Sequence, residues 1–302
     1  MSIPDRIHRT SFCAVTFLLF STMFLPDEAS GGETTRTWRK LTDTAAFKQR
    51  PVWSPDGSRL LFAQHDLDTI FLFERDTETG AVQRLTDRND PEYDAVYSPD
   101  GSQAAFSFDK TSPNQGDIEV YRIDLKSKEL KPVATGDGKL SHEEWATWSP
   151  DGKQIAFSST REGNQELHVT EIDGGDWVRL TSDPGIDAHP AWSPDGKSIA
   201  FSTNRWGDLE IATVAPDGTG LQRLTFSSGL DDYPAWSPDG SQLAYTTNRY
   251  GSLDICIRDV STRQDTVFRF DESIENFPSW TPDGKLTFVS NRDGGFEIYV
   301  ME

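Results

Sequence analysis

The sequence predicts an all-β protein: a six-bladed β-propeller with four-stranded antiparallel blades, formed by residues 35–302. The main observation is a phrase, Trp-Ser-Pro-Asp-Gly or a close variant, that occurs six times. The aromatic residues that open the copies are Trp53, Tyr97, Trp148, Trp192, Trp236 and Trp280, at intervals of 44, 51, 44, 44 and 44 residues. A period of this length is typical of repeat architectures, and four strand-like stretches per period are typical of propeller blades.

The fourth unit shows the four strand-like stretches most clearly. They are short, rich in β-branched or aromatic residues, and bounded by turn residues. They run from His189 to Ser193, Ser198 to Thr203, Leu209 to Val214, and Leu221 to Phe226.

The turns between the strands can also be predicted. Ser-Pro-Asp-Gly suits a type I turn, because Pro fixes φ at the second position, Asp suits the third and Gly is favoured at the fourth. The Pro-Asp-Gly sequence at 216–218 has the same role between the third and fourth strands. Asn-Arg-Trp-Gly at 204–207 and Asn-Arg-Tyr-Gly at 248–251 are expected between the second and third strands.

The two ends of the repeat array predict how the ring closes. The stretch from Trp38 to Thr42 resembles a fourth strand that has no unit in front of it. The last unit ends after its third strand, Phe296 to Val300. We therefore expect the N-terminal strand to complete the last blade, which removes the open sheet edges of an unclosed ring.

The first 31 residues have the composition of a secretory signal peptide. Arg6 and Arg9 precede an apolar run from Phe12 to Leu25, and small residues follow at 29–32. An uncleaved anchor is the alternative, because Asp27 and Glu28 lie close to the expected cleavage site. No second apolar segment follows, so we expect no further membrane insertion and a periplasmic or secreted bacterial protein.

Charge and cysteine content narrow the class of protein further. The net charge of −20 argues against nucleic-acid binding, which relies on Lys and Arg to neutralise phosphates. It fits a soluble protein, and we expect a monomer. Cys13 falls in the predicted signal, so the exported chain has one thiol, Cys256, which we expect to be a sheet residue of the core.

The repeat resembles a known family. Pro-Ala-Trp-Ser-Pro-Asp-Gly, followed by Ile-Ala-Phe-Ser-Thr-Asn-Arg, Glu-Ile and Arg-Leu-Thr, is similar to the repeat of the TolB C-terminal β-propeller, from residue 35 onward. TolB proteins carry an α/β domain before the propeller, whereas here the first strand follows the signal, so we expect the propeller without that domain. Prolyl oligopeptidase-like peptidases share the repeat type, but this chain has no Gly-x-Ser-x-Gly motif.

Two sets of residues upstream of the repeated aromatic are the candidate functional positions. The loops that enter each first strand should lie on the same face as the loops between the second and third strands, around the channel mouth. The minus-five set, five positions before the aromatic, is Lys48, Glu92, Glu143, Asp187, Asp231 and Glu275. The minus-three set, three positions before it, is Arg50, Asp94, Trp145, His189, Tyr233 and Phe277.

The two sets favour different roles. A residue repeated in almost every blade usually serves the blade, so the minus-five acids should accept backbone N–H groups or pair with Arg161, Arg205, Arg249 and Arg292. The alternative is a cation site, with Ca²⁺ on Glu143, Asp187, Asp231 and Glu275. The minus-three set varies from blade to blade, and its aromatic residues are suited to recognition or to plain loop packing.

We therefore expect an exported, non-catalytic binding module that holds a protein or peptide partner at the channel mouth through the minus-three set. The acidic neighbours would select basic or cationic features of that partner. We nominate no catalytic residue and expect no resident cofactor other than Ca²⁺.

The alternative is a carbohydrate-active enzyme, a metal-assisted lyase or hydrolase. Propellers with related repeats include oligogalacturonate lyases, which use a His-rich metal site. Of the histidines after the signal, only His142 and His189 fall in equivalent channel-facing loops, whereas His65 and His168 do not, so their positions do not favour a three-His cluster. Carboxylates at the channel could also serve a glycosidase.

Overall fold

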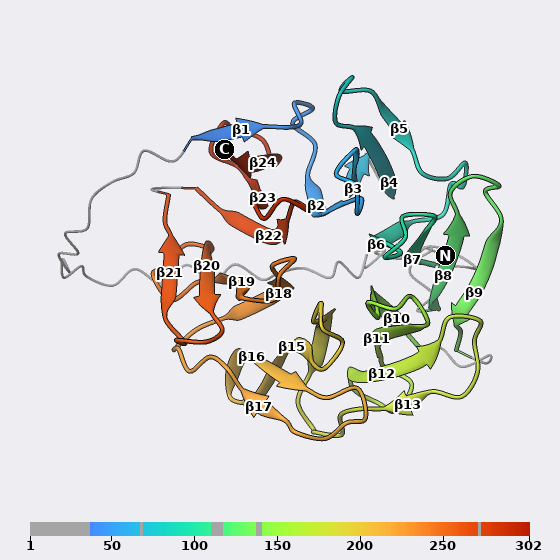
Figure 1. Ribbon diagram of the computed structural model, residues 1–302, viewed down its shortest axis with the longest axis vertical. Coiled ribbons are helices and arrows are strands. Elements are labelled where there is room, and N and C mark those ends of the chain that lie inside the picture. The colour runs from blue at the N-terminus through green and yellow to red at the C-terminus, as the bar shows by residue number, and fades with distance from the viewer. Residues whose placement is uncertain (1–36, 67–68, 110–116, 137–140, 271–272) are drawn as a thin grey trace, which may run out of the picture.

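The computed structural model describes residues 37–66, 69–109, 117–136, 141–270 and 273–302, and these form a closed ring of six four-stranded antiparallel sheets (Figure 1). The predicted fold class is therefore confirmed. The predicted signal at 1–31 lies outside the described residues. The described residues contain no helix that is long and apolar enough to span a membrane.

Each blade runs from an inner first strand to an outer fourth strand. Blade one is β2 (Lys48–Trp53), β3 (Arg59–Asp66), β4 (Thr69–Asp76) and β5 (Val82–Arg84). Blade two is β6 (Glu92–Tyr97), β7 (Gln103–Asp109), β8 (Ile118–Asp124) and β9 (Leu130–Ala134). Blade three is β10 (Glu143–Trp148), β11 (Gln154–Ser159), β12 (Glu166–Glu171) and β13 (Val178–Arg179).

The second half of the ring follows the same order until it reaches the chain end. Blade four is β14 (Asp187–Trp192), β15 (Ile199–Trp206), β16 (Asp208–Val214) and β17 (Gln222–Arg223). Blade five is β18 (Asp231–Trp236), β19 (Gln242–Thr247), β20 (Asp254–Asp259) and β21 (Asp265–Phe268). Blade six is β22 (Glu275–Trp280), β23 (Leu286–Ser290), β24 (Glu297–Met301) and β1 (Trp38–Lys40).

The N-terminal strand closes the ring as predicted. β1 pairs antiparallel with β24, and these two strands lie side by side in Figure 1. The register joins Trp38 to Met301 and Lys40 to Tyr299. A buried ion pair between Lys48 Nζ of blade one and Glu297 Oε2 of blade six, 2.8 Å apart, joins the two blades that meet at this point. The N-terminal strand therefore completes the last blade and covers the edge of β24.

The repeated phrase forms the turn between the first and second strands of every blade. In the first copy, Gly57 N donates to Ser54 O at 2.9 Å, and Ser54 Oγ donates to Asp56 Oδ1 at 2.7 Å. The glycine has a φ of 72°, in the left-handed region that glycine tolerates best. The hydrogen bonds from Ser54 and Ser58 lower the pKa of Asp56 to about 2. Every polar residue of the phrase thus serves the turn.

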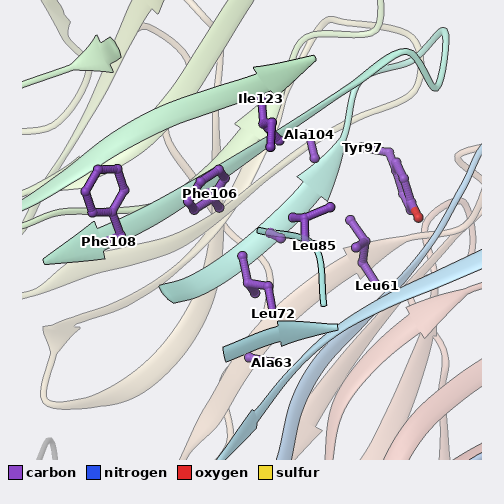
Figure 2. Close-up of a cluster of buried hydrophobic side chains, with 10 residues drawn as sticks. Leu61, Ala63, Leu72, Leu85, Tyr97, Ala104, Phe106, Phe108 and Ile123 are labelled. Carbon is purple, nitrogen blue, oxygen red and sulfur yellow. The ribbon is translucent and has the colours of Figure 1, made fainter. Parts of the chain in front are cut away.

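The core is divided between the blade interfaces. Figure 2 shows one such cluster, in which Leu61 and Leu72 of blade one pack near Phe106 and Ile123 of blade two. Five further clusters fill the other interfaces. Cys256 is fully buried in the cluster between blades four and five, as predicted, and burial raises the pKa of its thiol to about 12.

In four of the six blades the repeated tryptophan bonds to the preceding blade. The indole nitrogens of Trp148, Trp236 and Trp280 donate to the carbonyl oxygens of Val96, Ala191 and Ala235 at 3.0–3.2 Å. Each acceptor lies one residue before the aromatic position of the neighbouring blade. Trp53 instead donates to Thr287 Oγ1 at 2.9 Å. The phrase therefore fixes both the turn and the spacing between blades.

The limits of the strands in blade four differ from the sequence prediction. β14 begins at Asp187, two residues before the predicted start, and the outer strand is reduced to Gln222–Arg223. The added residues, Asp187 and Ala188, lie before a bulge at His189, and neither is β-branched or aromatic, the composition on which the prediction relied.

Candidate functional site

Every inner strand of the propeller contains a bulge at the same position, and the minus-three residue occupies it. In β14, pairing with β15 shifts register between Ala188 and Ala191, and equivalent shifts occur in the other five inner strands. The minus-three residues have φ values of 44° to 63°, in the left-handed region. The set therefore lies within the inner strands, not in the loops at a channel mouth as expected from the sequence.

The left-handed conformation has an energetic cost for these residues. A non-glycine residue in this region is destabilised by about 1–3 kcal/mol, and glycine or asparagine would be the least costly choices. None of the six minus-three residues is glycine or asparagine. In two blades the preceding side chain holds the bulge: Asp232 Oδ1 accepts from Tyr233 N at 2.7 Å, and Asn276 Oδ1 accepts from Phe277 N at 2.8 Å.

The bulges turn the minus-three side chains toward one another at the centre of the ring. Trp145 lies edge-on against His189, with ring centroids 4.2 Å apart, and His189 stacks on Tyr233 at 4.2 Å. Tyr233 continues to Phe277 at 4.6 Å, and the Arg50 guanidinium lies 4.9 Å from the Trp145 ring. Because Arg50 belongs to blade one and Trp145 to blade three, these side chains cross the channel and form a plug.

Two acidic side chains hold the polar members of this plug. Arg50 Nη1 lies 3.5 Å from Asp94 Oδ1, and His189 Nδ1 lies 2.5 Å from Asp232 Oδ1. Arg50 and His189 expose only 16% and 13% of their side chains. Burial raises the pKa of the Asp94 carboxyl, against the opposing effect of Arg50 and His189. The centre of the ring therefore combines aromatic faces with an Arg–Asp pair and a His–Asp contact that water reaches poorly.

Glu144 is a member of this site that the sequence analysis missed. It lies between the two sets, and burial together with the nearby Asp94 charge raises its pKa to about 8. Its Oε1 atom is 3.7 Å from His142 Nδ1, on the side of the loop that enters β10. The position four residues before the aromatic holds five other residue types in the other blades, so no repeat marked it.

A cavity of about 280 Å³ lies on one side of the plug. Arg50, His189, Tyr233 and Phe277 line one end of it. The remaining lining runs along the inner strands toward the repeated turns: Pro51, Val52, Trp53, Thr147, Pro190, Ala191, Pro234, Ala235, Trp236, Pro238, Pro278, Ser279 and Trp280. The cavity thus opens on the face of the Ser-Pro-Asp-Gly turns, opposite to the face expected from the sequence.

The minus-five residues are fully buried, and their side chains bond to neighbouring groups of the scaffold. Asp187 Oδ2 accepts from Arg205 Nη2 at 2.6 Å, and Asp231 Oδ2 accepts from Arg249 Nη2 at 3.1 Å. Glu275 accepts from Ser273 and Ser290 at 2.6 and 2.7 Å. Glu143 accepts from Ser159 at 2.8 Å, and Glu92 accepts from Thr86. Asp187 and Asp231 thus have the expected arginine partners, and Glu92, Glu143 and Glu275 accept from hydroxyl groups.

Lys48 is the exception in this set, and the structure explains it. The turn at the end of β3 in blade one has no arginine of the Asn-Arg type for an acid to pair with. Lys48 is completely buried and instead pairs with Glu297 of the neighbouring blade. The asparagines of the Asn-Arg turns bond to the entering loops, because Asn204 Oδ1 and Asn248 Oδ1 accept from Ile186 N and Leu230 N.

The cation hypothesis gains no geometrical support from these positions. Within the described parts of the chain, no group of three or more His, Cys, Asp or Glu side chains is arranged to hold a metal ion. Glu143, Asp187, Asp231 and Glu275 each bond to their own blade instead. The histidines are likewise separated: His168 is buried in β12, His65 lies in β3, and His189 pairs with Asp232.

Known proteins match part of this chain. The model of the TolB beta propeller domain family matches residues 114–232 and 227–302. An uncharacterised protein of Agrobacterium fabrum is 30% identical over 133 residues, which are 42% of this chain and 41% of that protein. The Tol-Pal system protein TolB of Francisella tularensis is 27% identical over 122 residues, 40% of this chain and 27% of the relative. The matched regions span less than half the length of these curated relatives.

Solved structures share the fold over most of the chain. A TolB-type protein of Agrobacterium tumefaciens superposes with a TM-score of 0.70 at 24% identity, covering 87% of this chain and 93% of that one. An oligogalacturonate lyase in complex with manganese has a TM-score of 0.60 at 17% identity, covering 87% and 92%. Both likenesses concern the fold alone, whereas the family model matches more than half of the sequence. The chain therefore belongs to the TolB β-propeller family.

Proposed function

We propose that the protein is an exported, non-catalytic binding module, acting as a monomer, that holds a protein or peptide partner in the central channel. The observation that carries the proposal is the minus-three set. Six positions with the same strained backbone carry six different side chains, and four of these converge on one cavity. A role in folding alone would favour the residue that fits the left-handed region at every blade, whereas recognition needs varied side chains.

The chemistry of the cavity supports a peptide or protein as the ligand. Tryptophan, tyrosine and arginine are the residues most often found at the energetic centre of interfaces. Here they are held by neighbours, so little side-chain entropy is lost on binding. The name of the TolB relatives places them in the Tol-Pal system, which is consistent with a protein partner. Export to the periplasm or the cell exterior rests on the predicted signal.

The enzyme alternative has weaker support. The oligogalacturonate lyase shares the fold at 17% identity, and a shared fold does not carry an activity. Its metal is not matched by any cluster of ligands among the described residues. Turnover of oligogalacturonate by the purified protein with manganese would favour the enzyme over the binding module.

The proposal is tested with random peptide libraries displayed on phage and selected on the immobilised protein. Selected peptides are then measured by fluorescence anisotropy against a double variant, Trp145→Ala with Tyr233→Ala. The matched control is Trp206→Ala with Tyr250→Ala, which removes the same side chains from exposed turns of blades four and five. We expect the first variant to remain folded and lose at least about tenfold in affinity, the equivalent of about 1.4 kcal/mol.

An equal loss of peptide affinity in both variants, or no loss in either, would contradict a binding site in the channel. Circular dichroism and thermal unfolding of both variants establish that they are folded before affinities are compared.

A further inference from the structure

The cavity beside the plug has the form of a pocket with one closed end. Arg50, His189, Tyr233 and Phe277 close it at the centre of the ring. Proline and small side chains form the wall, and tryptophans of the repeated phrase lie nearest the turns. Its volume of about 280 Å³ is at the lower end of the range for ligand pockets, about 300–1,000 Å³. It is sized for one or two residues of a chain.

Two polar atoms of lining residues lack a hydrogen-bond partner among the described residues. They are Arg50 Nη1 and Ser279 Oγ, both buried. Arg50 Nη1 has only the ion-pair contact to Asp94 at 3.5 Å, beyond a good hydrogen bond. A buried donor without a partner costs free energy that a ligand can recover by accepting from it. Both groups can donate to an oxygen.

The charge of the pocket lining is opposite to that of the whole protein. The net charge of the chain is −20, yet no carboxylate is among the described residues that line the cavity. Arg50 is the one fully charged side chain among those lining residues. A guanidinium presents a planar pair of donors that suits a carboxylate in particular.

We propose that this pocket binds the free C-terminal residue of a partner polypeptide, entering from the face of the Ser-Pro-Asp-Gly turns. The terminal carboxylate accepts from Arg50 and Ser279, and an apolar last side chain packs against the prolines and tryptophans of the wall. This inference rests on the proposed function and names the feature that the channel recognises.

A chain end fits this pocket better than an internal segment. The plug closes the channel, so an internal segment would have to enter and leave through the same opening and bury two strands of backbone. A chain end enters once and brings its own carboxylate. The pairing of Arg50 with Asp94 does not prevent this, because Arg50 Nη1 lies 3.5 Å from Asp94 Oδ1, which is too long for a good hydrogen bond. Arg50, His189 and Glu144 are the charged or titratable groups that face Asp94.

The experiment uses two phage libraries of the same random heptapeptide, one displayed with a free C-terminus and one displayed between fixed flanking sequences. We expect the free C-terminal library to yield peptides that end in apolar residues. These peptides should bind the Trp145→Ala, Tyr233→Ala variant more weakly than the wild-type protein. The strongest is synthesised as the free acid and as the C-terminal amide. Amidation should weaken binding by about ten- to a hundredfold, the range for a hydrogen bond to a charged group.

Protein variants test the same contact from the other side. Arg50→Gln should weaken the free acid about as much as amidation does, and should not weaken the amide further. Ser279→Ala should have the same selectivity with a smaller effect. The matched control is Lys197→Gln, which removes an exposed cation near the repeated turn of blade four, outside the pocket lining.

The outcomes separate this inference from the proposed function. Equal binding of acid and amide, or channel binders only from the flanked library, would overturn the C-terminal inference and leave the binding module intact. If neither library yields peptides whose binding is weakened in the Trp145→Ala, Tyr233→Ala variant, both the C-terminal inference and the proposed function are overturned. The comparison of acid with amide needs no protein variant, so it decides even if Arg50→Gln fails to fold.

Discussion

Residues of the minus-five and minus-three sets lie two positions apart on the same inner strands. The blades share a side-chain type at the first position but only a backbone conformation at the second. The minus-five residue is an acid in five of six blades, and each of these acids is fully buried and bonded to neighbouring groups of the scaffold. The minus-three residue differs in every blade and has a left-handed backbone in every blade. In one set the side chain repeats because the blade needs it. In the other only the backbone repeats, and the side chains are free to differ.

This contrast separates stability from recognition at neighbouring positions. Changes in the minus-five set should act mainly on the free energy of unfolding. Changes in the minus-three set should act mainly on binding, and the backbone should prefer glycine there. Substitutions in the two sets can test this division, beginning with the largest expected effect.

Asp187→Ala should lower the free energy of unfolding by about 3–5 kcal/mol, because it leaves the charge of Arg205 unpaired in a buried site. The Arg205 side chain is only 11% exposed, and its Nη2 atom lies 2.6 Å from Asp187 Oδ2. The measurement is urea unfolding followed by tryptophan fluorescence. Adding Arg205→Leu should restore most of the loss, because the pair is then replaced by apolar groups.

Asp208→Ala, an exposed acid in the same blade, is the control and should change stability by less than about 0.5 kcal/mol. If Asp187→Ala were equally mild, the minus-five acids would not be structural and the contrast between the two sets would fail.

Glu144 lies between the two sets and predicts a pH dependence. Its pKa in the folded protein is about 8, raised from 4.5, so the folded state holds a proton that the unfolded state releases between these pH values. The stability of the protein should therefore fall as pH rises from about 4.5 to 8, by up to about 1.4 kcal/mol per pH unit. Asp94, whose pKa is also raised, acts in the same direction.

Glu144→Gln should flatten this slope and make the variant more stable than the wild-type protein at pH 9. The neighbouring groups that remain are Glu143, Asp94, His142 and Trp145. Thermal unfolding at pH 5, 7 and 9 provides the test. A variant with the unchanged slope would show that Glu144 is not the group that titrates.

Glycine should be tolerated better than alanine in the minus-three set. Tyr233 has a φ of 54°, so Tyr233→Gly should be more stable than Tyr233→Ala by about 1 kcal/mol, although both lose the packing of the ring. The control is Ala235→Gly in the same strand, where glycine should lower stability by about 0.5–1 kcal/mol. A Tyr233→Ala variant more stable than Tyr233→Gly would contradict a strained bulge at this position.

The fold could be predicted from the sequence because each copy of the repeat corresponds to one blade. The spacing of the aromatic residues predicted six blades, and the unpaired stretch at Trp38 predicted closure by the N-terminal strand. The pairing of Asp187 and Asp231 with the arginines of the following turns was also predicted, because both partners recur at fixed distances. Repetition makes such contacts visible without coordinates.

The residues of the candidate site could be identified in the sequence, but the face of the ring on which the site opens could not be predicted. The minus-three residues were identified by their variation, yet residue type does not predict the bulge that places them inside the strands, because tryptophan, tyrosine and phenylalanine rarely adopt a left-handed φ. Without the bulge, the side of the channel on which the cavity opens could not be predicted. Glu144 was missed because its unusual pKa comes from burial beside Asp94, a residue of another blade.

In the proposed binding mode, a ligand enters on the turn face and meets the minus-three set. It is tested most directly by NMR of protein labelled with ¹⁵N in histidine, titrated with the free-acid peptide obtained from the C-terminal library. His189 belongs to the plug, His142 lies at the entering loop of β10 with a side chain 41% exposed, and His168 is buried in β12. We expect the ring signals of His189 to shift with the peptide while those of His142 and His168 do not. A shift of the His142 signals with those of His189 unchanged would place the ligand on the opposite face and rule out entry from the turn face.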